Sequence, residues 1–201
     1  MAPPSPRLLL GTNNPGKVRE FRRLLAGSGY DVVTPAGLGL SLDVDETGST
    51  YAENAAAKAR AFASAADCLA LADDSGIEVD ALDGRPGMYS ARYGTPGLDD
   101  AGRTALLVHE LTGIPNDRRT GRYRAVVAVA SPGGDVKLFE GVQEGRIAHL
   151  PRGARGFGYD PVFLVDGRTQ AELSDAEKDA ISHRGQAVRA AREYLRALLA
   201  E

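Results

Sequence analysis

Three observations predict an α/β protein with an elongated, mixed β-sheet flanked by helices. Short apolar runs at residues 7–11 and 69–72 are typical of buried strands. A polar turn at 132–135 separates two strand-like segments, which predicts a β-hairpin. Apolar residues recur at helical spacing between the strands, most clearly in the final segment 182–199. Helices and strands therefore mix along one chain of 201 residues, of which 43% are apolar, enough to bury a core.

The first predicted strand leads into a polar loop and a helix. Pro15 suits the first position of a helix, and Asn14 suits its cap. Thr50 and Glu53 have the spacing of a capping box, which predicts the start of a second helix. The chain is therefore expected to open with a strand, a polar loop and a helix, and a second helix precedes the strand at 69–72.

The rest of the chain continues this pattern. We expect a helix at 99–112 and a second pair of strands near 145–150 and 161–165. The proline-rich residues 1–6 are expected to form a flexible tail. The length of residues 7–201 suits one domain or two small lobes that share a cleft, and any second lobe would be built from the middle hairpins.

Composition excludes several classes of protein. The formal net charge of −3 argues against a general nucleic-acid binder, because such proteins carry a net basic face. No run approaches 18 apolar residues, so no membrane span is expected. The start is too short and too rich in proline for a signal peptide, and the lone Cys68 fits a reducing cytoplasm. The histidines and Cys68 lack the spacing of zinc ligands, and the serine-hydrolase elbow is missing from the sequence.

The loop after the first strand is a candidate phosphate-binding site. Residues 11–18, GTNNPGKV, nearly match the loop that cradles phosphates in many nucleotide-binding proteins. Val18 replaces the hydroxyl residue that holds Mg²⁺ in that loop, which argues against a P-loop kinase or NTPase. A helix start with Thr12, Asn14 and a solvent-facing Lys17 can still hold phosphate. A capped turn with a surface lysine is the alternative, and the spacing alone leaves both open.

Two adjacent carboxylates follow the apolar run at 69–72. Ligands of α/β proteins gather at the carboxyl ends of strands, and Asp73 and Asp74 are predicted to lie at such an end. Adjacent carboxylates repel each other unless a cation or hydrogen-bond donors compensate. Mg²⁺ usually takes one or two carboxylates together with phosphates. The pair therefore favours a metal site over an ordinary acidic turn.

The acidic stretch 43–48 lies just before the second predicted helix. Within that helix Asn54 and Lys58 are four residues apart and share a face. By itself an acidic loop is more often a solvated surface. Beside a metal site, however, it could supply a second carboxylate.

Two further segments carry ligand-binding character. Phe157 and Tyr159, separated by a glycine, offer flat surfaces on which a ligand ring could stack, although a bend with core aromatics explains them equally well. Lys178, His183 and Arg184 place donors near the start of the last helix. Cations there oppose the helix dipole, so an acceptor-rich ligand explains them better than capping does.

Together these segments resemble the inosine triphosphate pyrophosphatase family, the purine-surveillance pyrophosphatases of the house-cleaning type. The matching pieces occur in the family's order and span Leu8 to Ala187. They are LLLGTNNPGKVREF, DETGSTYAENAAAKARAFA, LADDSGIEVDALDGRPGMYSARY, GFGYDPVF and AEKDAISHRGQA. Asn13 stands where bacterial relatives often have glycine, and Pro15 lies within the loop, but neither departure should remove a phosphate contact.

The resemblance implies a fold, a reaction and a set of roles. It implies two lobes with a nucleotide cleft between them, a homodimer, and Mg²⁺-dependent cleavage of ITP, dITP or XTP to a nucleoside monophosphate and pyrophosphate. Asp74 would be the general base and a metal ligand, and Glu46 a second metal ligand. The triphosphate would lie along Thr12, Asn13, Asn14, Pro15, Gly16, Lys17, Lys58 and Ser75. The sugar and base would lie among Phe157, Gly158, Tyr159, Asp160, Lys178, His183 and Arg184.

Three alternatives remain at this point. A P-loop kinase or NTPase would release phosphate or phosphorylate an acceptor. A regulatory nucleotide-binding module would lack catalysis, but its binding of a polyanion sits poorly with the carboxylates Glu46, Asp73 and Asp74. A related pyrophosphatase would act on modified pyrimidines.

Overall fold

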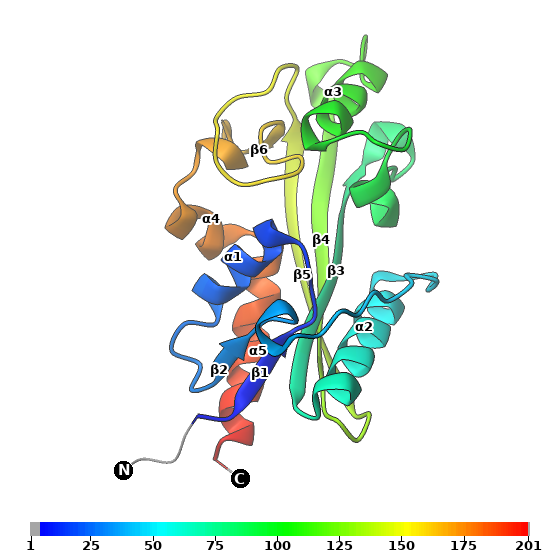
Figure 1. Cartoon of the computed structure of the whole chain (residues 1–201). Coiled ribbons are helices and arrows are strands. Elements are labelled where there is room, and N and C mark those ends of the chain that lie inside the picture. Colours follow the sequence, from blue (N-terminus) through cyan, green and yellow to red (C-terminus); the bar gives the residue numbers. More distant parts are fainter. Residues whose placement is uncertain (1–4, 201) are drawn as a thin grey trace. The chain divides into compact units, whose positions relative to one another are not determined.

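The structure is a computed structural model that describes residues 5–200, so most of the predicted tail, residues 1–4, lies outside the described residues. It contains a seven-stranded sheet with helices packed around it (Figure 1). The strands are β1 (Arg7–Leu10), β2 (Asp31–Val33), β3 (Leu69–Val79), β4 (Thr120–Ala130), β5 (Val136–Ile147), β6 (Phe163–Val165) and β7 (Arg168–Thr169). The α-helices are α1 (Pro15–Leu24), α2 (Tyr51–Ala66), α3 (Asp100–Glu110), α4 (Asp175–Ile181) and α5 (His183–Leu198). No helix within residues 5–200 is long and apolar enough to cross a membrane.

The sheet is mixed, as predicted. Its strand order is β2-β1-β3-β4-β5-β6-β7. β1 runs parallel to both β2 and β3, whereas β6 runs antiparallel to β5 and β7. The predicted hairpin is formed by β4 and β5, and the amide of Ser131 donates to the carbonyl of Asp135 across its turn at 3.0 Å. The α/β prediction is therefore confirmed.

One strand boundary was predicted wrongly. β3 does not end at Ala72 but continues to Val79, so the two aspartates lie inside the strand. Both are buried and paired with cationic or amide groups, so their polarity does not interrupt the strand. The short strands β2 and β7 and the helix α4 were not predicted either, because a few residues carry too little periodicity to be recognised.

The chain divides into two compact units. The first unit holds residues 5–74, 125–140 and 184–200, and the second holds 75–124 and 141–183. The long strands β3, β4 and β5 each contribute residues to both units.

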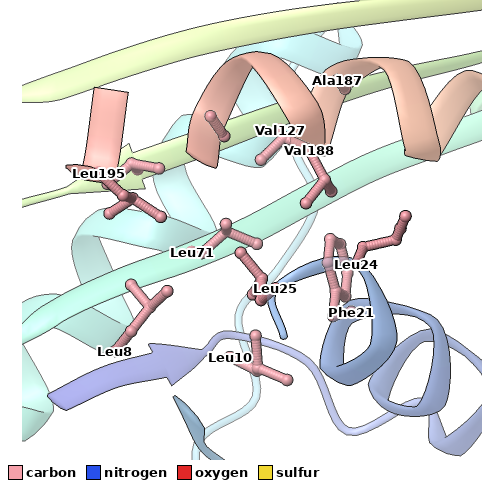
Figure 2. Packing of buried hydrophobic residues seen from close by; sticks show 12 residues of the cluster. Leu8, Leu10, Phe21, Leu24, Leu25, Leu71, Val127, Ala187, Val188 and Leu195 are labelled. Atoms are coloured by element: carbon pink, nitrogen blue, oxygen red, sulfur yellow. The ribbon is translucent and has the colours of Figure 1, made fainter. Parts of the chain in front are cut away.

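The core of the first unit lies where α1 and α5 pack on one face of β1, β3 and β4 (Figure 2). Leu8 and Leu71 from the strands meet Phe21 from α1 and Val188 from α5 there. Side chains alternate along a strand, so residues two apart share a face. Asp73, two residues after Leu71, therefore points toward α1 and α5.

The opposite face of β1 and β3 carries α2. A Cβ atom at Gly11 would lie 2.7 Å from Cδ2 of Phe62 in α2 and 3.0 Å from Cβ of Ala72 in β3. Glycine is thus required for the close approach of α2 to the end of β1. Asp74, two residues after Ala72, points by the same alternation toward α2.

The second unit has its own hydrophobic core and, close to it, a buried arginine. Ile77, Leu107 and Phe163 are fully buried in this core. The Arg119 guanidinium is also buried and donates to the carbonyl oxygens of Leu111, Ile147 and Ala148 at 2.7, 2.8 and 2.9 Å. These bonds tie the end of α3 to the end of β5.

Candidate active site

The loop between β1 and α1 is a capped helix start, as predicted. The amide of Gly11 donates to the carbonyl of Leu71 at 2.7 Å, which keeps the loop beside β3. Oδ1 of Asn14 accepts from the amides of Gly16 and Lys17 at 2.8 and 3.1 Å. This cap fixes the direction in which Lys17 leaves the helix. Phosphate binding by Thr12, Asn13, Pro15 and the rest of the loop stays a prediction.

Asp73 and Asp74 lie on opposite faces of β3. We expected a cation or hydrogen-bond donors to compensate the two carboxylates, and the pleat of the strand gives each of them its own set of partners. Asp73 contacts groups from α1 and α5, whereas Asp74 contacts groups from α2 and the loop before it. The two aspartates therefore belong to two chemical environments.

The Asp73 group is a closed set of alternating charges. Lys17 Nζ lies 2.9 Å from Oδ1 of Asp73, and Arg184 donates to Oδ2 through Nε and Nη2 at 3.2 and 3.1 Å. Arg184 Nη1 donates to Oε2 of Glu20 at 2.5 Å. Asp73, Arg184 and Glu20 are all at least 96% buried. Two positive and two negative side chains therefore compensate one another, and only Lys17 is partly exposed, at 17%.

Two members of this group, Asp73 and Arg184, are held in the ionised state by their neighbours. Burial by itself would raise the pKa of Asp73, but Lys17 and Arg184 outweigh it and hold that pKa well below its ordinary value. Burial would likewise lower the pKa of Arg184, but Asp73 and Glu20 outweigh it and raise the pKa. For Lys17, burial prevails over Asp73 and lowers the pKa. The Lys17 side chain is only 17% exposed, so the expectation that it faces solvent was wrong.

The Asp74 group is less completely compensated. Nδ2 of Asn54 donates to Oδ2 of Asp74 at 3.0 Å, while Oδ1 of Asn54 accepts from the amide of Gly48 at 2.8 Å. Lys58 Nζ lies 2.5 Å from Oε1 of Glu46 and 3.7 Å from Oδ1 of Asp74. Burial raises the pKa of Asp74 above its ordinary value, and Lys58 and Asn54 offset only part of that rise. The predicted shared face of Asn54 and Lys58 is therefore confirmed, and it faces Asp74.

Glu46 and Asp74 are the residues that could hold a metal. Within the described part of the chain, no three or more histidine, cysteine, aspartate or glutamate side chains are grouped as metal ligands would be. Mg²⁺ does not need such a cage, because it commonly takes one or two carboxylates and completes its shell with water and phosphate. Glu46 and Asp74 both lie within ion-pair distance of the single Lys58 ammonium, so two carboxylates with oxygen ligands face one cationic group there. The donor set fits Mg²⁺ on that ground.

Several predicted ligands of the sugar and base form a group in the second unit. Oδ2 of Asp160 accepts from the amide of Phe157 at 2.8 Å and also from Nζ of Lys178. Lys178 Nζ lies 5.2 Å from the centre of the Phe157 ring. Gly156 has a φ of 76°, and a Cβ there would collide with Oδ2 of Asp160. The glycine thus permits the tight turn that brings Phe157, Asp160 and Lys178 together.

The two aromatic residues of this turn differ in burial. Tyr159 is 5% exposed, packs in the core of the second unit and donates its hydroxyl to the carbonyl of Ser90 at 2.8 Å. Phe157 is only partly buried. The alternative of a core aromatic therefore describes Tyr159, while Phe157 keeps the character of a stacking surface.

Other predicted residues have contacts of their own. The His183 ring stacks on Tyr123 with ring centres 4.6 Å apart and an interplanar angle of 8°. The amide of Gly158 donates to Oδ2 of Asp100 at 2.9 Å. Ser75 is half-buried in β3 directly after Asp74. The guanidinium of Arg184 is bonded to Asp73 and Glu20, so at most two of its five N–H groups remain for a base.

Sequence reasoning missed three participants in these groups. Asp73 was recognised only as half of a metal-binding pair, and its role as the partner of Lys17 and Arg184 was not predicted. The two-residue period of a strand was the available signal, because it separates Asp73 from Asp74. Glu20 was overlooked although it lies three residues after Lys17, on the same face of α1. The direct bond from Asn54 to Asp74 depends on tertiary packing and has no local signal.

The chain is similar to known proteins over nearly its full length. The model of the Ham1 family matches residues 8–194. A dITP/XTP pyrophosphatase of Symbiobacterium thermophilum is 52% identical, with 97% of this chain and 98% of that protein covered. A dITP/XTP pyrophosphatase of Bacillus subtilis is 46% identical, with 94% and 96% covered.

A solved structure agrees with the fold described above. The HAM1 protein from Coxiella burnetii matches with a TM-score of 0.84 and 38% identity, covering 94% of this chain and 98% of that chain. The order of strands and helices, the charged groups on β3 and the matches to sequence and structure lead to one assignment. This chain belongs to the Ham1 family.

Proposed function

We propose that this protein hydrolyses the non-standard purine nucleotides ITP, dITP and XTP to a nucleoside monophosphate and pyrophosphate, and so removes them from the nucleotide pool. The observation that carries the proposal is the Asp74 group, a buried and incompletely compensated carboxylate beside Lys58 and Glu46. The names of the two relatives, both dITP/XTP pyrophosphatases, support it.

The first unit is suited to the triphosphate. Attack of water on phosphorus needs neutralisation of the phosphate oxygens and an oriented nucleophile. Lys17 and Lys58 supply positive charge, and Thr12 and Asn14 supply hydrogen bonds along the loop. Mg²⁺ held by Glu46 and Asp74 would add charge neutralisation and make water more acidic. Asp74, as a carboxylate that would touch both the metal and its bound water, would accept the proton of the attacking water.

The second unit is suited to the base. Phe157 offers a ring surface, and Lys178 and His183 offer donors. The oxygen at position 6 of hypoxanthine and xanthine is an acceptor, whereas adenine carries an amino donor there. Buried donors facing this position reject the mismatched base by a factor of about 10⁴ or more, because a buried donor is left unpaired. We propose that Arg184 contributes to this selection of the base as well.

Product analysis with a panel of nucleotides tests this function. The protein is incubated with Mg²⁺ and ITP, XTP, GTP, ATP or dUTP, and the released anion is identified. We expect pyrophosphate from ITP and XTP, a strong preference for ITP over ATP, and loss of turnover in excess EDTA. Release of phosphate would favour an NTPase, cleavage of dUTP alone a pyrimidine enzyme, and binding without turnover a regulatory module. Equal turnover of ATP and ITP would refute the donor-selection argument.

We also propose that the enzyme is a cytoplasmic homodimer. The lone Cys68, which is only partly exposed and forms no intrachain disulfide, is compatible with a reducing compartment. Light scattering coupled to size exclusion tests the dimer directly. A mass near the 21.2 kDa of one chain at micromolar concentration would refute it.

A further inference from the structure

The ammonium group of Lys58 lies between the two carboxylates assigned to the metal. Its Nζ atom is 2.5 Å from Glu46 Oε1 and 3.7 Å from Asp74 Oδ1. The side chains of Lys58 and Asp74 are only 12% and 6% exposed, so these charges are weakly screened. One positive charge, that of Lys58, therefore already lies close to both carboxylates in this structure.

We propose that Lys58 holds the place of the metal until nucleotide arrives, and thereby suppresses metal binding to the free protein. This inference rests on the metal site of the proposed function. A cation bound to both carboxylates would come close to the Lys58 ammonium, and like charges at short distance repel strongly where solvent is largely excluded. Metal binding therefore requires the ammonium group to leave.

The helix that carries Lys58 is not free to move away with it. Four residues earlier, Asn54 donates to Asp74 at 3.0 Å and accepts from the amide of Gly48 at 2.8 Å. Gly48 itself is tightly packed, since a Cβ there would lie 2.6 Å from Oδ1 of Asn54. The ammonium must therefore leave by rotation of its own side chain. A buried ammonium needs a new acceptor, and phosphate oxygens of a nucleotide would provide one.

The other lysine of the first unit does not have this role. Lys17 pairs with Asp73, which is also bonded to Arg184. That group is balanced in charge and lies on the opposite face of β3 from Asp74. Lys58 thus differs from Lys17 in being paired with the proposed metal ligands themselves.

Binding of Mn²⁺ to the nucleotide-free protein tests the inference without measuring activity. Mn²⁺ serves as the probe for Mg²⁺, and free Mn²⁺ is followed by electron paramagnetic resonance. The variants are Lys58→Met, which keeps the length and removes the charge, and Lys58→Arg, which keeps the charge. Arg60→Met is the matched control, because Arg60 is an exposed residue of the same helix that donates to the carbonyl of Gly134. Thermal unfolding of each variant verifies that it is folded.

We expect Lys58→Met to bind Mn²⁺ at least about 10-fold more tightly than the parent, within the usual range of coupling between sites. Lys58→Arg and Arg60→Met should stay within about twofold of the parent. Adding Glu46→Gln to Lys58→Met should abolish this increase in Mn²⁺ affinity. That result would locate the bound ion at Glu46. An unchanged affinity in Lys58→Met would overturn the inference.

The failure of this inference can be told apart from failure of the proposed function. If Glu46→Gln weakens Mn²⁺ binding in the parent but Lys58→Met changes nothing, the metal site stands and the place-holding role fails. If neither substitution affects Mn²⁺ binding, the inference fails together with the assignment of the metal ligands. Pyrophosphate release from ITP, measured with and without EDTA, then decides the proposed function independently.

Discussion

The two faces of β3 carry the same type of side chain, an aspartate, at neighbouring positions. The partners of the two carboxylates differ. Toward α1 and α5, Asp73 lies in a balanced set with Lys17, Arg184 and Glu20, and its pKa is held low. Toward α2, Asp74 is only partly compensated, and its pKa is raised. The partners of Asp73 favour a fixed structure. The partners of Asp74 favour the binding of a cation and the acceptance of a proton. The difference shows that partners from the flanking helices, not the residue type, set the role of each aspartate.

The largest expected effect is on stability and concerns Asp73. Asp73→Asn leaves Lys17 and Arg184 without their shared counter-charge in a buried place, which should cost about 3–5 kcal/mol of unfolding free energy. Urea unfolding followed by circular dichroism measures it. Asp67→Asn is the control, because Asp67 is exposed and its left-handed backbone also suits asparagine. A loss below about 1 kcal/mol would mean that the charge set does not hold the first unit together.

The next effect is on turnover and concerns Asp74. Asp74→Asn should leave a folded protein whose turnover of ITP is lower by roughly 10²-fold or more, the scale of a lost general base. The same Asp67→Asn variant serves as control and should keep parental turnover. Near-normal turnover in Asp74→Asn would remove this residue from the mechanism and end the functional contrast between the two faces.

A smaller effect is expected for Lys17, which links the balanced group to the predicted phosphate loop. Lys17→Ala removes one charge-assisted contact, so kcat/KM for ITP should fall by roughly 10-fold while the protein stays folded. Arg184 remains to compensate Asp73 in this variant. Lys137→Ala, at an exposed position of β5, is the control. An unchanged kcat/KM for Lys17→Ala would mean that the loop is only a capped helix start.

The smallest effect is a difference in pH dependence. The pKa of Asp74 is raised on folding, so its ionisation costs stability as pH rises above about 3.8, the ordinary value. Asp74→Asn should therefore gain stability relative to the parent as the pH rises from about 3.8 through the raised pKa of Asp74. The pKa of Asp73 is lowered, so its contribution is complete well above pH 3.8 and declines only as pH falls below that value. The cost of Asp73→Asn should accordingly stay level from pH 5 to 7.

Urea unfolding of the two variants and the parent at several pH values tests this contrast. We expect the stability difference between Asp74→Asn and the parent to grow as the pH rises above about 3.8, and the difference for Asp73→Asn to stay constant from pH 5 to 7. Parallel profiles would mean that the two carboxylates share one environment after all.

The sequence was most informative where a signal is local. Asn14 as a helix cap, the hairpin around Ser131 and the last helix could all be predicted, because caps, turns and helical periodicity are encoded by neighbouring residues. The end of β3 could not, because whether aspartates interrupt a strand depends on partners distant in sequence, such as Arg184 for Asp73. Burial of Lys17 depended in the same way on its tertiary partner.

The candidate site followed the same division. The residues of the Asp74 group were predicted, apart from the bond that Asn54 makes to Asp74 itself. The capping box at Thr50 formed only in part. Thr50 accepts from the amide of Glu53, but the Glu53 carboxylate accepts from the amide and hydroxyl of Ser49. The spacing of Thr50 and Glu53 identified the start of the helix, but it did not identify the partner of each side chain.

The fit of Gly11 against Phe62 has a consequence for substitutions in the loop after β1. A Cβ atom at position 11 would meet the Phe62 ring of α2 and the Cβ atom of Ala72 in β3, so any larger residue there must displace one of them. A methyl group at this position would therefore change the distance from the loop to the helix that carries Lys58, while leaving every polar residue of the loop in place.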